Sequence, residues 1–229
     1  DALRAMFLVY AAIGAAVWAL YLRLPVVRAE DSPPPSPLGP SRGIVVRLAA
    51  LFCVDSFAGG LLINALLALW LFDRFGLSLA AAGAFFFWTG LLGAFSQLAA
   101  PVLARRIGLV NTMVFTHIPA SLCLIAAAYS PAIEWALALL LVRSALSQMD
   151  VPARSAYVMS VVTPPERPAA ASFTAVPRSL ASAAGPVIAG ALFAGGAMAM
   201  PLVACGVLKI AYDLALYAGF RRVAPQFAD

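Results

Sequence analysis

The sequence predicts an all-α integral membrane protein with about seven transmembrane helices. Of its 229 residues, 63% are hydrophobic and 11% are charged, and the mean hydropathy is +0.95. Soluble domains are closer to half apolar and a quarter charged, so a chain of this length could not hide so much apolar surface from water. Nothing alternates with the ~10-residue strand period of a β-barrel. Helices are therefore the expected spanning elements, because they satisfy their own backbone groups in lipid.

Seven apolar stretches reach the roughly 20 residues that a helix needs to cross a bilayer. In chain order they cover residues 5–22, 47–72, 81–103, 110–129, 132–160, 169–193 and 201–220. The first is longer than the apolar core of a signal peptide, roughly 7–15 residues, and no small-residue cleavage site follows it. We interpret it as a true span. Because the chain begins at Asp1 without Met, we expect this span to mark the point where a longer protein is cut.

The longest connection, residues 23–46, is rich in Pro and Ser and carries no hydrophobic periodicity. Such a composition is typical of a tether between two helical units, with a regulatory segment as the alternative. Cys53, Cys123 and Cys205 occur singly in three different spans, without the spacing of a metal or redox site. No grouping of nucleophile, base and orienting acid is apparent. We therefore expect no cofactor, no metal and no enzymatic activity.

The distribution of arginine predicts the orientation of the chain. Placing residues 23–46 in the cytoplasm leaves only Arg4 and Arg74 outside. Nine residues then lie inside, namely Arg23, Arg28, Arg42, Arg47, Arg105, Arg106, Arg167, Arg221 and Arg222. Positive residues favour the cytoplasmic side, so we expect the central loop and the C-terminus there, in the plasma (inner) membrane. The net charge of +5 reflects the basic residues at the cytoplasmic ends of the spans. We therefore expect no nucleic-acid partner.

Six charged residues are expected deep inside the predicted spans, away from their ends. They are Asp55, Arg143, Asp150, Arg178, Lys209 and Asp213. Each charge in mid-membrane costs at least about 2.5–3.5 kcal/mol on insertion scales. The sequence therefore predicts a polar interior that the helices shield from lipid, built either of structural ion pairs or of a path for substrate or protons.

Helical spacing indicates which of these charges share a face. Asp150 and Arg154 are four residues apart, as are Lys209 and Asp213, so each pair is expected to meet on one helix face. Arg143 and Asp150, seven apart, are expected on one face as well. Pro152 removes a backbone donor and predicts a bend near residues 149–150.

Asp55 and His117 stand apart from these pairs. No base lies within four residues of Asp55 along its own helix, so we expect it to be the best candidate for a proton carrier. The alternative is a packing aspartate that pairs with an arginine from a missing half of the protein. We interpret His117, the only histidine, as a packed or hydrogen-bonded imidazole.

Small residues indicate close helix packing. Gly59 and Gly60 lie in one span, and Gly185 and Gly190 lie with several serines in another. Small faces allow membrane helices to approach one another closely.

Four motifs carry a resemblance that covers nearly the whole chain. They are "ARRIGLVNTM" (104–113), "LLLVRSALSQ" (139–148), "TPPERPAAAS" (163–172) and "GPVIAG" (185–190). In the same order, they are similar to a D-R-x-G-R-R loop, an arginine-bearing helix motif, a P-E-x-R loop and a G-P-x-x-G helix. Together they resemble the C-terminal half of a major facilitator superfamily transporter. The match departs from the family in that Arg105 stands where the first loop usually has aspartate.

The resemblance implies a domain organisation. Residues 1–22 would be the last helix of a missing N-terminal half, and residues 23–46 the cytoplasmic central loop. Residues 47–222 would be a six-helix half made of two inverted three-helix repeats, and residues 223–229 a cytoplasmic tail. The family's activity is secondary active transport of a small molecule by alternating access, most often coupled to protons, at a site near the membrane midplane. The implied partners are the lipid bilayer, protons, a substrate of unknown identity and the missing half.

The resemblance and the buried charges together assign candidate roles. The expected substrate or proton pathway comprises Asp55, Asn64, Arg143, Gln148, Asp150, Arg178, Lys209 and Asp213. The expected gating or structural residues are Arg105, Arg106, Pro152, Arg154, Glu166, Arg167, Gly185, Pro186 and Gly190. Two alternatives remain open at this point. One is a non-transporting membrane receptor or scaffold, and the other is a seven-helix retinal protein with Lys209 as the Schiff base.

Overall fold

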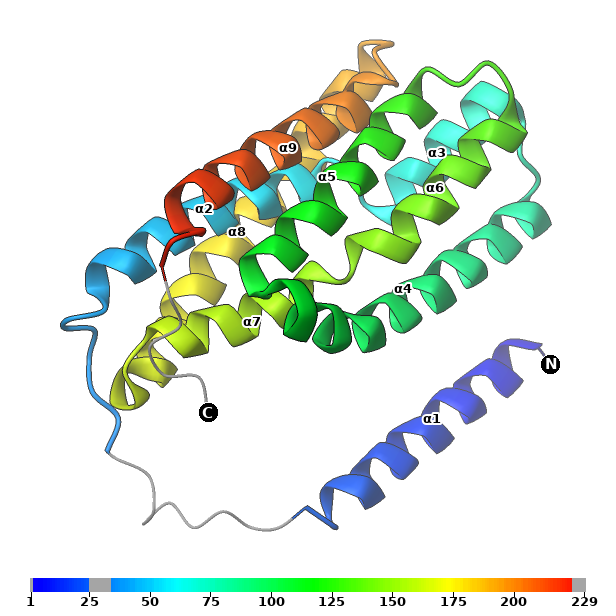
Figure 1. Ribbon diagram of the computed structural model, residues 1–229. Helices are drawn as coiled ribbons and strands as arrows, with labels where there is room; N and C mark the ends of the chain where they lie inside the picture. Colours follow the sequence, from blue (N-terminus) through cyan, green and yellow to red (C-terminus); the bar gives the residue numbers. More distant parts are fainter. Residues whose placement is uncertain (1, 25–33, 224–229) are drawn as a thin grey trace. The chain divides into compact units, whose positions relative to one another are not determined.

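The computed structural model describes residues 2–24 and 34–223, and all regular structure in these ranges is helical (Figure 1). Within them, seven helical segments are long and apolar enough to cross a membrane, as predicted. Parts of the predicted central loop and tail, residues 25–33 and 224–229, lie outside the described residues. The chain divides into two compact units, Asp1–Pro34 and Pro35–Asp229. The first unit contains the apolar helix α1 (Ala2–Tyr21).

The second unit holds the remaining six candidate spans. Its helices are α2 (Arg42–Gly60), α3 (Asn64–Phe75), α4 (Leu79–Ile107), α5 (Leu109–Ala128), α6 (Ile133–Ser147), α7 (Asp150–Val161), the 3₁₀ helix η2 (Pro164–Glu166), α8 (Arg167–Ala194) and α9 (Met200–Phe220). Two predicted spans are each divided. The span expected at 47–72 is formed by α2 and α3, and the span expected at 132–160 by α6 and α7.

The first interruption follows the glycine pair at the end of α2. The amide nitrogens of Leu61 and Leu62 donate to carbonyls at positions 57–59, and Ile63 is extended before α3 begins. Glycine is a poor helix former, which weakens the helix at this point. Hydropathy could not reveal the break, because residues 61–63 are all apolar.

The second interruption lies where Pro152 predicts a bend. α6 ends at Ser147, and α7 begins at Asp150. Proline has no amide hydrogen, and its ring collides with the carbonyl four residues earlier, here that of Gln148. The predicted bend is therefore a full interruption. It also separates Arg143 from Asp150, so the expectation that the two lie on one helix face is wrong.

Most of the helices in the second unit pack against helices that are not their neighbours in the chain. α2 lies against α8 and α9, α4 against α6 and α7, and α5 against α6 and α9 (Figure 1). At the α2–α8 contact, a Cβ on Gly60 would collide with the Ser182 carbonyl and lie 3.2 Å from Gly185 Cα. Close approach therefore requires these glycines, as the small-residue pattern predicts. Gly190 differs, because its Cβ would meet nothing within 4 Å. α8 continues as one helix through Pro186.

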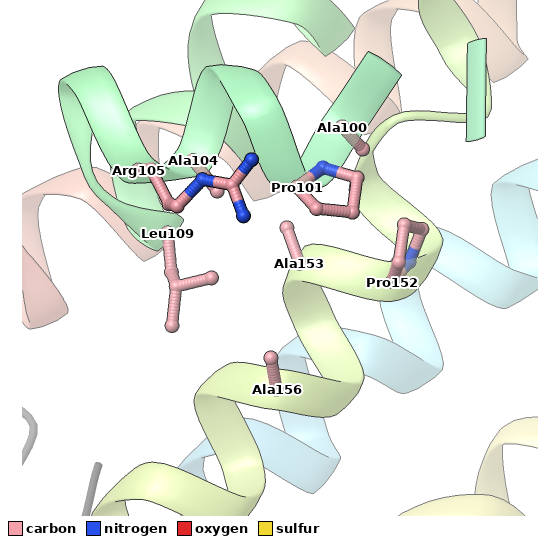
Figure 2. A pocket seen from close by; sticks show the side chains of 8 residues that line it. All are labelled: Ala100, Pro101, Ala104, Arg105, Leu109, Pro152, Ala153 and Ala156. Atoms are coloured by element: carbon pink, nitrogen blue, oxygen red, sulfur yellow. The ribbon is translucent and has the colours of Figure 1, made fainter. Parts of the chain in front are cut away.

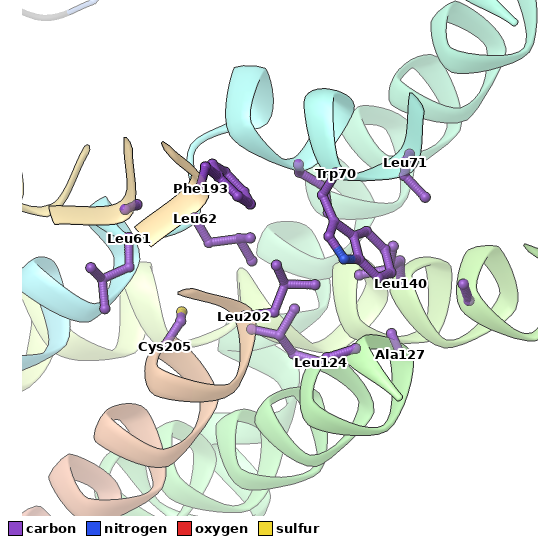
Figure 3. Close-up of a cluster of buried hydrophobic side chains, with 14 of the residues drawn as sticks. Leu61, Leu62, Trp70, Leu71, Leu124, Ala127, Leu140, Phe193, Leu202 and Cys205 are labelled. Atoms are coloured by element: carbon purple, nitrogen blue, oxygen red, sulfur yellow. The ribbon is translucent and has the colours of Figure 1, made fainter. Parts of the chain in front are cut away.

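Two apolar clusters form at opposite ends of the helices. The first cluster surrounds Trp70 and includes Leu124, Leu140 and Leu202 (Figure 3). The second cluster is built around Phe52 with Leu48, Val45, Met113, Tyr157, Tyr212 and Leu216. α5 contributes Leu124 to the first cluster and Met113 to the second, and the polar His117 lies between them along the helix. The unit thus has a polar layer between two apolar layers.

Candidate functional site

A polar cavity of about 540 Å³ occupies the middle layer of the second unit. Its walls come from α2, α5, α8 and α9 and from both sides of the α6–α7 interruption. It collects most of the residues that the sequence proposed for a pathway, namely Asp55, Arg143, Gln148, Asp150, Arg178 and Lys209, together with Arg154. The size is in the range of small-molecule sites.

A second polar cavity of about 300 Å³ adjoins the first. Asn64, at the start of α3, lines it with Thr89 and Gln97 of α4. Arg143, Ser147 and Gln148 line both cavities, so the end of α6 connects them. The two interruptions therefore meet the same polar region, which is where irregular backbone can be accommodated at membrane depth.

Asp55 lies at the centre of the ion-pair network. Its Oδ2 accepts a hydrogen bond from Arg154 Nη2 at 2.7 Å, and its Oδ1 accepts one from Lys209 Nζ at 2.6 Å. Both cations come from other helices, α7 and α9. Asp55 thus has two charged partners, although its own helix places no base within four residues of it. The reason is geometric, since helix packing supplied the bases that the spacing along α2 did not.

Arg154 joins Asp55 to Asp150. The predicted pair between Asp150 and Arg154, one turn apart on α7, is present, and the same guanidinium nitrogen contacts both carboxylates. The guanidinium also lies 5.0 Å from the ring centroid of Phe52, which is a cation–π distance. Arg154 thus links the polar layer to the second apolar cluster.

The expected direct pair between Lys209 and Asp213 does not form, because His117 lies between them. His117 Nε2 is 3.2 Å from Lys209 Nζ, and its Nδ1 is 3.1 Å from Asp213 Oδ1. An ammonium group only donates hydrogen bonds, so Nε2 must accept and Nδ1–H must donate to Asp213. Asp213 therefore reaches the cavity network through the imidazole. The sequence identified His117 only as a hydrogen-bonded residue, because its partners are about a hundred positions away.

Arg143 and Arg178 complete the charged lining. Among the residues that the structure describes, no carboxylate lies within ion-pairing distance of either guanidinium. Arg178 also lines a neighbouring cavity with Arg154. The three acids of the polar layer are all engaged by other partners.

The predicted basic turn lies at one end of the unit. Arg105 of α4 faces Pro152, Ala153 and Ala156 of α7 across a small apolar cavity of about 300 Å³ (Figure 2). Arg106, the next residue, is exposed and does not line this cavity. The structure therefore brings Arg105, and not Arg106, to the α6–α7 interruption.

The P-E-x-R turn connects the beginning of α2 to the α7–α8 corner. Glu166 accepts hydrogen bonds from the backbone nitrogens of Gly39 and Ser41 and from Thr163 Oγ1, the last two at 3.3 Å and 2.8 Å. Arg167 Nε donates to the Met159 carbonyl at 3.2 Å. Both residues therefore hold the chain at helix ends.

Comparison with known proteins supplies no further guide. The chain matches no protein-family model, no curated protein and no solved structure. Within residues 2–24 and 34–223, no group of three His, Cys, Asp or Glu side chains could hold a metal ion. The chemistry available to the described cavity is thus ion pairing and hydrogen bonding.

Proposed function

We propose that the second unit is one half of a secondary active transporter that moves a small molecule by alternating access. The observation that carries this proposal is the charged cavity of the middle layer, which lies between two apolar clusters. Transporter sites lie at such a depth, near the bilayer midplane. Intramembrane charges that face a bundle interior also mark substrate and ion pathways.

The positions of the two interrupted spans support the proposal. If the six spans are taken as two sets of three, α2–α3 is the first span of one set and α6–α7 the first span of the other. Interrupted helices in corresponding positions of two repeats are the best sequence-level indicator of a transport site. Both interruptions border the polar cavities.

The packing pattern also agrees with two related sets of three helices. The counterparts in the two sets are α2–α3 and α6–α7, α4 and α8, and α5 and α9. If each helix is replaced by its counterpart, the contact between α2 and α8 becomes the contact of α4 with α6 and α7, and both contacts are present. The same exchange turns the α2–α9 contact into the contact of α5 with α6 and α7, and again both are present. Inverted repeats of the major facilitator type would have this property.

Coupling to protons, in this proposal, involves His117 and Asp213. Asp55 and Asp150 are held by cations, whereas Asp213 is contacted only by the imidazole among its described ion-pair partners. Histidine is the side chain whose charge ordinarily changes near neutral pH. By the arginine distribution, we place the central loop and C-terminus on the cytoplasmic side of the plasma (inner) membrane.

Alternating accessibility tests this function without knowledge of the substrate. In the full-length protein, with its native cysteines replaced by alanine, Ser56→Cys places a thiol in the cavity wall. A membrane-impermeant maleimide should label it in both right-side-out and inside-out vesicles. Ala127→Cys, fully buried in the first apolar cluster, is the matched control and should resist labelling from both sides. Labelling of Ser56→Cys from one side alone is the result expected of a receptor or scaffold, and it would overturn the proposal.

A further inference from the structure

The charges of the cavity do not balance within the described residues. Arg154 is engaged by Asp55 and Asp150, Lys209 by Asp55, and Asp213 by His117. Every acid that reaches the network is therefore already in contact with a partner. Arg143 and Arg178 remain as two further positive charges on the cavity wall.

Two positive charges at this depth are expensive unless something compensates them. Guanidinium groups stay protonated in proteins, so neither arginine can lower the cost by losing its proton. Arg178 lines a common cavity with Arg154, which adds like-charge repulsion to the cost of burial. A ligand that carries negative charge would remove both penalties when it binds.

The surroundings of the two arginines suit an anion. They project from different helices, α6 and α8, so a ligand between them would be held from two sides. Ser147 and Gln148 line the same cavity and provide neutral hydrogen-bond donors. Guanidinium groups bind carboxylates and phosphates with two parallel hydrogen bonds, which favours these groups over simple halides.

We propose that the cavity binds a small organic or inorganic oxyanion through Arg143 and Arg178. This inference rests on the proposed transport function, because it names the class of substrate for the same cavity. The network of Asp55, Asp150, Arg154 and Lys209 forms the fixed part of the site, since its two carboxylates match its two cations. Arg143 and Arg178 form the part whose charge the ligand completes.

The experiment measures the thermal stability of the purified full-length protein in detergent. Malonate, phosphate, sulfate and benzoate are the anionic probes at equal ionic strength, and glucose and choline are the neutral and cationic controls. At least one anion should raise the melting temperature of the wild type. Arg143→Gln and Arg178→Gln should each weaken that anion's apparent affinity on the order of tenfold or more, as expected for a lost charge-assisted hydrogen bond. Arg106→Gln, which removes an exposed arginine, should leave the affinity unchanged.

The ligand-free melting temperature provides a readout that does not depend on the choice of probe. Removing a half-buried cation that has no carboxylate partner should leave this temperature unchanged or raise it. A marked fall for both glutamine variants would mean that a carboxylate outside the described residues neutralises the arginines, and it would overturn the inference. Arg143→Lys should retain part of the stabilisation by the anion, because lysine keeps the positive charge. It should lose the rest, because lysine lacks the planar guanidinium that donates two parallel hydrogen bonds.

Flux measurements separate this inference from the function on which it rests. An anion that binds through both arginines without any flux in liposomes would contradict transport and support the anion site. Flux of glucose or choline, with no stabilisation by any of the four anions, would support transport and contradict the anion site. Binding and flux of the same anion, both lost in the double glutamine variant, would support the two together.

Discussion

Asp55 and Glu166 are both almost fully buried carboxylates, with residue exposures of 4% and 2%, but they are held in different ways. Asp55 lies in the middle layer and contacts two cationic side chains from other helices. Glu166 lies at a helix corner and accepts hydrogen bonds from backbone nitrogens and a hydroxyl group. The same chemical group is thus stabilised by opposite charge in one region and by neutral donors in the other.

The two carboxylates have different partners because backbone amide hydrogens without a partner occur only at certain places in a helical protein. Within a helix every amide hydrogen is used by a carbonyl four residues earlier, so a carboxylate in the middle layer can be matched only by side chains. The first turn of a helix leaves amide hydrogens without partners and carries a partial positive charge. Glu166 binds the amides just before α2, where such donors are available. Removing a charge should therefore cost more in the middle layer than at the corner.

The largest effect is expected for Asp55→Asn, because Lys209 then loses its only described carboxylate contact. A buried charge without a partner costs about 3–5 kcal/mol, so the free energy of unfolding in detergent should fall by an amount of this order. Asp73→Asn, at an exposed position near the end of α3, is the matched control and should change stability by less than about 0.5 kcal/mol.

A double variant tests whether the loss comes from the stranded lysine. Asp55→Asn combined with Lys209→Gln should be more stable than Asp55→Asn alone, since the unmatched ammonium is gone. If the double variant is instead the less stable of the two, Asp55 and Lys209 are not coupled, and the charge-matching account of the middle layer is wrong.

A smaller effect is expected for Asp150→Asn. Arg154 keeps its 2.7 Å contact with Asp55, so its charge remains partly matched after this change. The expected loss is that of one charge-assisted hydrogen bond, about 1.5–3 kcal/mol in the free energy of unfolding. Chemical denaturation of both variants under one condition checks the order. Equal losses for Asp55→Asn and Asp150→Asn would show that Arg154, and not Lys209, controls the stability of the network.

The sequence was sufficient to predict contacts that depend on local spacing or composition. Seven apolar segments, the interruption near Pro152 and the Asp150–Arg154 pair all follow from hydropathy, proline chemistry and the helical repeat. The close approach at Gly60 and Gly185 follows from residue size. In each case the information lies within one helix or one turn.

Contacts between helices could not be predicted in this way. Asp55 meets Lys209 across 154 positions and Arg154 across 99, so the partners depend on which helices pack together and in what rotation. The same limitation explains why Lys209 was paired with Asp213 from their spacing, although His117 lies between them. The break after Gly60 was missed because its residues are as apolar as the helices on both sides.

The smallest effect on global stability is expected for Glu166→Gln, which changes the carboxylate at the helix corner and leaves the middle layer intact. The amide of glutamine can still accept a hydrogen bond, but it lacks the negative charge and the second acceptor oxygen. The neutral donors at this corner do not become unmatched charges when the carboxylate is lost, unlike Lys209 after Asp55→Asn. The melting temperature should therefore change little.

The effect of Glu166→Gln should instead be local. Gly39 and Ser41 donate their amide hydrogens to the carboxylate, so hydrogen exchange at these two positions should accelerate several-fold. Exchange at Phe52 and His117, deep in α2 and α5, should remain at the wild-type rate and serves as the internal control. A melting temperature that falls as far as that of Asp55→Asn would show that the corner and the middle layer stabilise the unit equally. The depth of a carboxylate would then not determine the kind of partner that it requires.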